Sequence, residues 1–171
     1  PGAAAAHRAR MLDLAVEHEP GLAVDRRELA RAKPSYTVET MREVRRELGD
    51  AAPVALLIGA DSLLGLPGWK EWTALFGLAH FIVAARPGAP IASSLPPALQ
   101  ETLGGRWTES AVELRQRPAG LVLAMRQPLL PQSATAVRQG IATGTGWRDQ
   151  VPPPVADYVT RHGLYATEAA R

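Results

Sequence analysis

Hydrophobic and polar positions along the chain alternate between two patterns, one typical of short buried strands and one typical of amphipathic helices. Three continuous apolar runs predict strands: Val54 to Ile58, His80 to Ala85 and Gly120 to Met125. A shorter run, Leu22 to Val24, predicts a fourth strand. Because Val54 to Ile58 is apolar at every position, we expect it to be a central strand buried on both faces.

Helical spacing separates these runs. The segments that show it are Ala4 to Glu17, Thr37 to Leu48, Trp69 to Leu78, Ser133 to Ile141 and Val155 to His162, with one more helix near Leu99 inside the Pro- and Gly-containing stretch Ala89 to Arg117. Strands that alternate with helices require crossover connections, so the pattern predicts an α/β fold with a mostly parallel sheet flanked by helices. No internal repeat or interdomain linker is visible, and residues 1–171 are expected to form a single domain.

The apolar positions inside two of these helices predict which faces are buried. In the first helix, Leu12 and Ala15 are expected on the face toward the core. In the second, Met41, Val44 and Leu48 follow one another at intervals of three and four residues. Both helices should therefore pack against the rest of the protein through a single apolar stripe.

Composition narrows the functional classes. The chain has 171 residues, 46% of them hydrophobic and 21% charged, with a formal net charge of +2 and no cysteine. The small net charge argues against nucleic acid as a partner, and the absence of cysteine excludes a thiolate metal site. No apolar run approaches the roughly 18 residues of a membrane span. We therefore expect a cytoplasmic protein with no membrane partner.

The first candidate site follows the apolar run at Val54. Gly59 allows the chain to turn after the strand, and Asp61 supplies an acceptor suited either to a ribose hydroxyl or to capping the next helix. Ligands of open α/β sheets bind just beyond the carboxyl ends of the strands. Trp69, eight residues after Asp61, is either a packing residue or a stacking platform for a ring.

The second candidate site is Pro34-Ser35-Tyr36-Thr37, at the start of a predicted helix. If Thr37 caps this helix, free N–H groups at its start could bind a carboxylate or a phosphate. The alternative is a plain helix cap with a packing tyrosine.

The third candidate site lies in the segment from Gln132 to Arg138. Ser133 and Thr135 place two hydroxyls in the first turn of a helix, and Arg138 follows one turn later. Such donors suit a phosphate group, in particular the triphosphate of a nucleotide. The alternative is a helix-capping serine with a solvated arginine.

Taken together, these segments resemble the bacterial nicotinate-nucleotide adenylyltransferases in order and spacing. The resemblance rests on Pro34 to Thr40, on Ile58 to Ser62 with Trp69, on Arg86-Pro87-Gly88, on Ser133 to Arg138, and on the ending from Tyr158 to Tyr165. It covers nearly the whole chain and implies a Rossmann-like nucleotidylyltransferase fold. It further implies transfer of an adenylyl group from ATP to nicotinate mononucleotide, giving nicotinate adenine dinucleotide and pyrophosphate on the way to NAD.

The resemblance also implies roles for single residues. Trp69 would stack on the nicotinate ring, the N–H groups around Tyr36 and Thr37 would receive its carboxylate, and Arg86 would bind substrate. Gly59 and Asp61 would face the ribose of ATP. Ser133, Thr135 and Arg138 match the phosphate-binding motif, in which Gln132 stands where the family usually has isoleucine. Mg²⁺ is expected as the companion of ATP.

One family feature is absent from the sequence. Members carry a histidine pair spaced H-x-G-H after a first strand, and His7, His18, His80 and His162 do not have that spacing. The resemblance therefore assigns no catalytic residue to this chain, predicts that the first strand of the fold is missing, and predicts little pyrophosphate release by the chain alone. The alternatives are a non-catalytic nucleotide-binding remnant and a related enzyme such as a pantetheine-phosphate adenylyltransferase.

Overall fold

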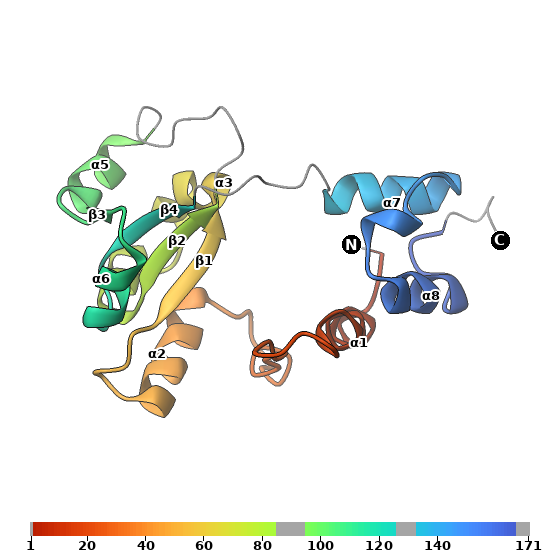
Figure 1. Ribbon diagram of the computed structural model, residues 1–171, viewed down its shortest axis with the longest axis horizontal. Coiled ribbons are helices and arrows are strands. Elements are labelled where there is room, and N and C mark those ends of the chain that lie inside the picture. Colours follow the sequence, from red (N-terminus) through yellow and green to blue (C-terminus); the bar gives the residue numbers. More distant parts are fainter. Residues whose placement is uncertain (1, 85–94, 126–132, 167–171) are drawn as a thin grey trace. The chain divides into compact units, whose positions relative to one another are not determined.

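The computed structural model describes residues 2–84, 95–125 and 133–166 (Figure 1), and the chain divides into two compact units. One unit comprises residues 1–31 and 130–171, and the other comprises residues 32–129. Each unit has its own cluster of buried apolar side chains. The expectation of one domain over residues 1–171 stays a prediction.

A parallel sheet of four strands forms the centre of the unit 32–129. Across the sheet the order is β1 (Ala55–Gly59), β2 (His80–Ala84), β4 (Val122–Met125) and β3 (Trp107–Thr108). All three neighbouring pairs are parallel, which confirms the predicted α/β fold. β3 was not expected, because a strand of two residues is too short to show a period.

Two strand predictions are wrong. Among the described residues β1 lies at one end of the sheet, and its Leu57 is 60% exposed, so β1 is not a central strand buried on both faces. A continuous apolar run predicts a strand but does not say which strands flank it. Leu22 to Val24 forms no strand in the part of the chain that the structure describes, and Leu22 is 61% exposed.

Short helices connect the strands of this unit and precede them. They are α2 (Thr37–Leu48), α3 (Ala60–Leu64), α4 (Leu75–Leu78), α5 (Pro97–Leu103) and α6 (Ala111–Gln116), with 3-10 turns η1 (Leu66–Gly68) and η2 (Trp72–Ala74). α2 has the predicted bounds. The helix expected from Trp69 to Leu78 is shorter, because the chain is extended at Trp69 and turns helical only at Trp72.

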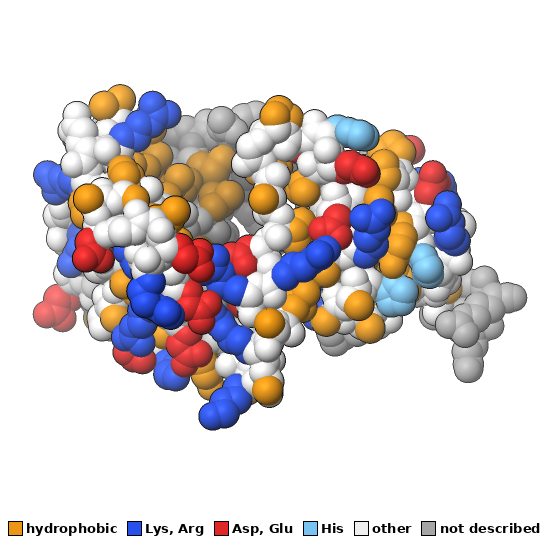
Figure 2. All heavy atoms as spheres, turned by 90° about the horizontal axis from the view of Figure 1, so that it is seen from below, with side chains coloured by type: hydrophobic (Ala, Val, Ile, Leu, Met, Phe, Trp, Pro, Cys, Tyr) orange, Lys and Arg blue, Asp and Glu red, His pale blue; other side chains and the backbone are white. Residues whose placement is uncertain are grey.

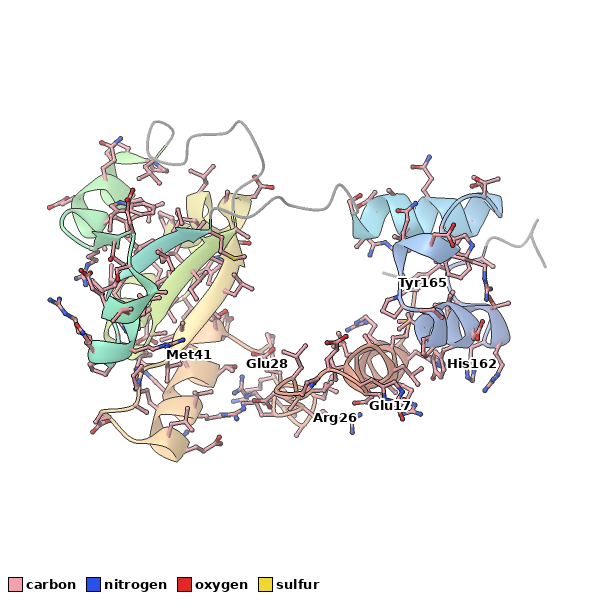
Figure 3. The ribbon with its side chains drawn as sticks, in the orientation of Figure 1. Glu17, Arg26, Glu28, Met41, His162 and Tyr165 are labelled. Atoms are coloured by element: carbon pink, nitrogen blue, oxygen red, sulfur yellow. The ribbon has the colours of Figure 1, made fainter. Side chains whose placement is uncertain are left out.

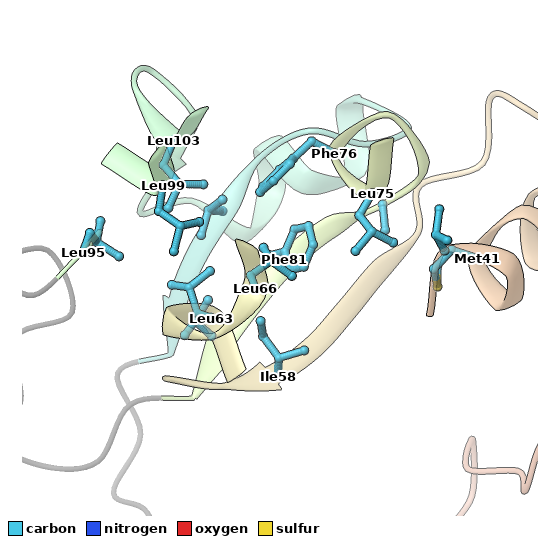
Figure 4. Close-up of a cluster of buried hydrophobic side chains, with 14 residues drawn as sticks. Met41, Ile58, Leu63, Leu66, Leu75, Phe76, Phe81, Leu95, Leu99 and Leu103 are labelled. Carbon is cyan, nitrogen blue, oxygen red and sulfur yellow. The ribbon is translucent and has the colours of Figure 1, made fainter. Parts of the chain in front are cut away.

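The core of this unit lies on one face of the sheet (Figure 4). Ile58, Phe81 and Val122 point to that face from three strands, where leucines of α3, η1, α4 and α5 cover them. The fully buried leucines of the described residues are Leu63, Leu66, Leu75, Leu99 and Leu103. These leucines cover one side of β1 and of the turn that follows it. The packing therefore sets the position of Gly59 and Asp61 at the carboxyl end of the strand.

A buried arginine joins several loops of the same unit. Arg45 of α2 is only 6% exposed, and its guanidinium donates to the backbone oxygens of Leu78 (2.7 Å), Ala52 (2.5 Å) and Pro118. The buried face of α2, which was predicted to be apolar, thus includes a charged side chain. Leu48 was expected on this face but is 58% exposed. Arg45 is buried because four carbonyl groups, including that of Gly49, replace its hydration.

His80 at the start of β2 makes a second buried link. It is fully buried, its Nδ1 accepts from the N–H of Leu121 (3.0 Å), and its Nε2 lies 2.8 Å from the carbonyl oxygen of Arg117. Because an amide N–H can only donate and a carbonyl can only accept, Nδ1 is the acceptor of this ring and Nε2 the donor. His80 is therefore a residue of the scaffold.

The other unit contains helices α1 (Ala5–Val16), α7 (Ala134–Thr143) and α8 (Pro153–Arg161), with the 3-10 turn η4 (Arg148–Gln150). α1 packs against α8, and Nδ1 of His7 lies 2.9 Å from the hydroxyl of Tyr158. Leu12 is 55% exposed, contrary to the predicted buried face of α1. Met11 and Leu14 contact the cluster instead. Figure 3 labels His162 and Tyr165, which follow α8.

Gly140 allows a close approach inside α7. A Cβ atom at this position would lie 2.7 Å from the carbonyl oxygen of Thr145 and 2.9 Å from Cβ of Trp147. Trp147 is 9% exposed and belongs to the buried cluster of the unit. The second half of α7 thus packs directly against Thr145 and Trp147, which follow it in the chain.

Candidate nucleotide-binding site

The carboxyl end of β1 holds two of the expected site residues. Gly59 is the last residue of β1 and the N-cap of α3, and Asp61 stands in the first turn of α3. Both are exposed, and no side chain caps α3. Asp61 therefore does not act as the helix cap, and its carboxylate lies at the strand end where ligands of parallel sheets bind.

The start of α2 differs in one detail from the expectation. Tyr36, not Thr37, is the N-cap, and Thr37 is the first helical residue. No side chain caps this helix. The carbonyl of Tyr36 accepts from the N–H groups of Glu39 (3.0 Å) and Thr40 (3.2 Å). An uncapped helix start presents N–H groups and the positive end of the helix dipole, which favour an anion.

Trp69 lies directly after η1, where its N–H donates to the carbonyl of Leu66 at 2.9 Å. The indole is partly buried and packs against the core cluster. Its role as a stacking platform for a ligand stays a prediction.

Four charged side chains that the sequence analysis did not identify as site residues connect the segment after Trp69 to α2. Lys70 Nζ lies 2.6 Å from a carboxylate oxygen of Glu39 and 4.5 Å from the centre of the Tyr36 ring. Arg42 donates to both carboxylate oxygens of Glu71. Glu39 and Arg42 are one helical turn apart on α2, but their partners follow about thirty residues later, so no local pattern could identify the pairs.

These contacts change the titration of the groups involved. The hydrogen bond from Arg42 holds the pKa of the Glu71 carboxyl below its ordinary value of 4.5. The hydrogen bond to Glu39 raises the pKa of Lys70 above 10.5. Lys70, Glu71 and Arg42 are therefore charged at neutral pH, and acidic and basic side chains alternate along the link.

The residues of the expected phosphate-binding turn lie together at the start of α7. Ser133 is the N-cap, and its Oγ accepts from the N–H of Ala136 at 3.1 Å, which confirms the helix cap. Arg138 is exposed, and its Nη2 lies 3.5 Å from Oγ1 of Thr135. A pocket of about 300 Å³ opens beside Ser133 and Arg138, with Val137 among its apolar lining.

The expected residues thus fall into two groups, one in each compact unit. Arg86 and Gln132 lie outside the described residues. Basic and acidic side chains are interspersed on the face shown in Figure 2, in keeping with the net charge of +2. Among the described residues no three His, Asp or Glu side chains are placed to hold a metal ion, and no helix is long and apolar enough to cross a membrane.

The chain is similar to proteins of a known family. The cytidylyltransferase-like family matches residues 1–140. A probable nicotinate-nucleotide adenylyltransferase of Stenotrophomonas maltophilia is 55% identical over 170 residues, which cover 96% of this chain and 77% of that protein. One from Xylella fastidiosa is 43% identical over 169 residues, covering 96% and 76%.

A solved structure has the same fold. The nicotinic acid mononucleotide adenylyltransferase of Plasmodium falciparum, complexed with NaAD, superposes with a TM-score of 0.61 at 14% identity, covering 94% of this chain and 73% of that one. At this identity the likeness shows the Rossmann-like nucleotidyltransferase fold alone. The family follows from the sequence relatives, which share it over nearly all of this chain. The chain belongs to the nicotinate-nucleotide adenylyltransferase family, within the cytidylyltransferase-like proteins.

Proposed function

We propose that this chain supplies binding groups for the transfer of an adenylyl group from ATP to nicotinate mononucleotide, which releases pyrophosphate and forms nicotinate adenine dinucleotide. Because the sequence contains no H-x-G-H pair, the chain alone should bind both substrates but release little pyrophosphate. A phosphate oxygen of the mononucleotide attacks the α-phosphorus of ATP, and the bond from that phosphorus to the oxygen of the leaving pyrophosphate breaks. The identity of 55% over 170 residues carries this proposal. Within the chain, the uncapped start of α2 beside the Trp69 segment supports the nicotinate half.

The described residues suit positioning and charge stabilisation, on which nucleotidyl transfer depends. N–H groups at Thr37 would receive the carboxylate of the pyridine ring, and Trp69 would stack on its face. Ser133, Thr135 and Arg138 would bind phosphates of ATP at the start of α7. Asp61 would accept from a ribose hydroxyl.

Nucleotidyltransferases generally use a divalent metal, and we propose Mg²⁺ bound to ATP as the substrate form. This assignment needs no metal cage within the chain, because Mg²⁺ usually keeps waters and binds substrate phosphates. A cytoplasmic location is part of the same proposal and fits a sequence without cysteine.

Calorimetric titration of nicotinate mononucleotide into the chain and into Trp69→Ala tests the assignment. The variant should bind this ligand more weakly by about 1–3 kcal/mol, the scale of a lost ring stack, while ATP binds as before. Trp107→Ala, at an indole that is 37% exposed in β3, is the matched control and should bind both ligands normally. Equal losses for both ligands in Trp69→Ala would make Trp69 a core residue only.

A further inference from the structure

Two segments that are distant in sequence are joined through the side chain of Lys70. Its ammonium group lies 2.6 Å from a carboxylate oxygen of Glu39 and 4.5 Å from the centre of the Tyr36 ring. Tyr36 is the N-cap of α2, and Lys70 is the neighbour of Trp69. Lys70 therefore contacts the start of α2, which is expected to bind the carboxylate of the ligand. It also belongs to the segment of Trp69, which is expected to stack on the ring of the ligand.

A second link lies one residue further along the same segment. Arg42 binds both carboxylate oxygens of Glu71, at 2.5 and 3.3 Å. Glu71 has a φ of +48°, in the left-handed region that non-glycine residues rarely adopt. Such a conformation persists only where surrounding contacts hold it. The bidentate pair supplies such a contact, so the backbone beside Lys70 is constrained.

An isolated ion pair at the surface contributes little, because water screens it and two long side chains must be ordered. Here the pairs act together. Four charges of alternating sign and one aromatic ring join the same two segments, and a bidentate arginine adds directional hydrogen bonds. The consequence of such a link lies in the relative placement of the segments, more than in the stability of the fold.

We propose that Lys70 is a positioning residue, which holds the Trp69 segment at a set separation from the start of α2 and so prepares the site for the pyridine ring and its carboxylate. The inference rests on the proposed function. Lys70 acts through Tyr36 and Glu39 and leaves the ATP half of the site unchanged. A preordered site binds more tightly because less freedom is lost on binding.

Titration of nicotinate mononucleotide and of ATP into wild-type chain, Lys70→Met and Lys70→Arg tests this role. Lys70→Met keeps the length of the side chain but removes the charge, and should weaken mononucleotide binding about twofold to fivefold, the range of an exposed ion pair. ATP binding should stay the same. Lys70→Arg keeps both the pair with Glu39 and the contact with the ring, and should restore wild-type affinity.

Glu39→Gln supplies a matched check, because it breaks the same pair from the other side. If Lys70 acts through Glu39, the double variant should bind no more weakly than the weaker single variant. Arg46→Met, at an exposed position of α2, is the control for loss of a positive charge. Equal mononucleotide affinity in wild type and Lys70→Met overturns the positioning role alone. Failure of the wild-type chain to bind the mononucleotide overturns the proposed function and this inference with it.

Discussion

Arg138 shows how one side chain can be tested for a role in binding phosphate. It is exposed, and its Nη2 lies 3.5 Å from Oγ1 of Thr135. Arg138→Lys keeps the charge but removes the planar fork of donors, so ATP should bind more weakly by about 1–2 kcal/mol. Calorimetry measures this difference, with Arg161→Lys on α8 as the control. Unchanged affinity would leave Arg138 as a solvated arginine.

Arg45 is a second single residue whose role can be tested, and its effect is on the stability of the fold. Replacement by methionine keeps the apolar stem but removes the donor to the backbone oxygens of Leu78 and Ala52, whereas the oxygen of Pro118 keeps the N–H of Val54. Buried acceptors without a partner are costly, and we expect the free energy of unfolding to fall by about 2–3 kcal/mol. Denaturant unfolding measures it. Arg46→Met, one residue along and exposed, should cost less than about 0.5 kcal/mol, and a similar loss in both variants would contradict the assignment.

At the scale of elements, the link between α2 and the segment before η2 should respond to pH. Because the pKa of Glu71 is lower in the folded protein than its ordinary value of 4.5, the pair with Arg42 stabilises the fold above that value and is lost as the pH falls through the folded pKa. The difference in melting temperature between wild type and Arg42→Met should therefore be greatest near neutral pH and shrink below about pH 4.5. A difference that stays constant from pH 7 to pH 3 would mean that Arg42 acts through packing alone.

Elements with a strong period were predictable from the sequence, whereas their neighbours in space were not. α2 has the predicted bounds because Met41 and Val44 follow helical spacing between a proline and a glycine. β3 and α6 are too short for a period to appear. The position of β1 at an end of the sheet, among the described residues, could not be predicted from its own residues, since strand order depends on long-range pairing.

The candidate site divides in the same way. Gly59, Asp61 and Ser133 could be found because a strand end or a helix start leaves a local signature. The link from Lys70 to Glu39 leaves none, because the two residues meet only after the chain has folded. The burial of Arg45 could not be predicted either, because α2 is rich in arginine and glutamate and nothing in its sequence distinguishes Arg45 from the exposed charged residues.

At the scale of the whole molecule, two separate apolar clusters predict independent contributions to stability. Ile58 belongs to the cluster on the sheet and Ile141 to the cluster between the helices of the other unit. Each Ile→Val exchange should cost about 0.5–1.5 kcal/mol. Because the two residues belong to different clusters of the described residues, the costs should add within about 0.5 kcal/mol when both changes are combined and unfolding is followed by denaturant.

A pair within one cluster is the control. Ile58 and Val83 are direct neighbours in the register of β1 and β2, so Ile58→Val combined with Val83→Ala should depart from additivity by more than that amount. Coupling between Ile58 and Ile141 of the same size would show one continuous core and favour the single domain expected from the sequence.

Gly140 has a consequence for anyone who would engineer a more robust variant of this protein. Exchange of a helical glycine for alanine is a standard choice, since it usually improves helix stability by up to about 1 kcal/mol. At this position the added methyl group would meet the carbonyl oxygen of Thr145 at 2.7 Å. Relief of that clash requires α7 or the chain after it to move, and α7 begins with the residues expected to hold ATP. At this position the exchange would therefore lower stability and also displace the helix that begins with those residues, and directed libraries should leave codon 140 unchanged.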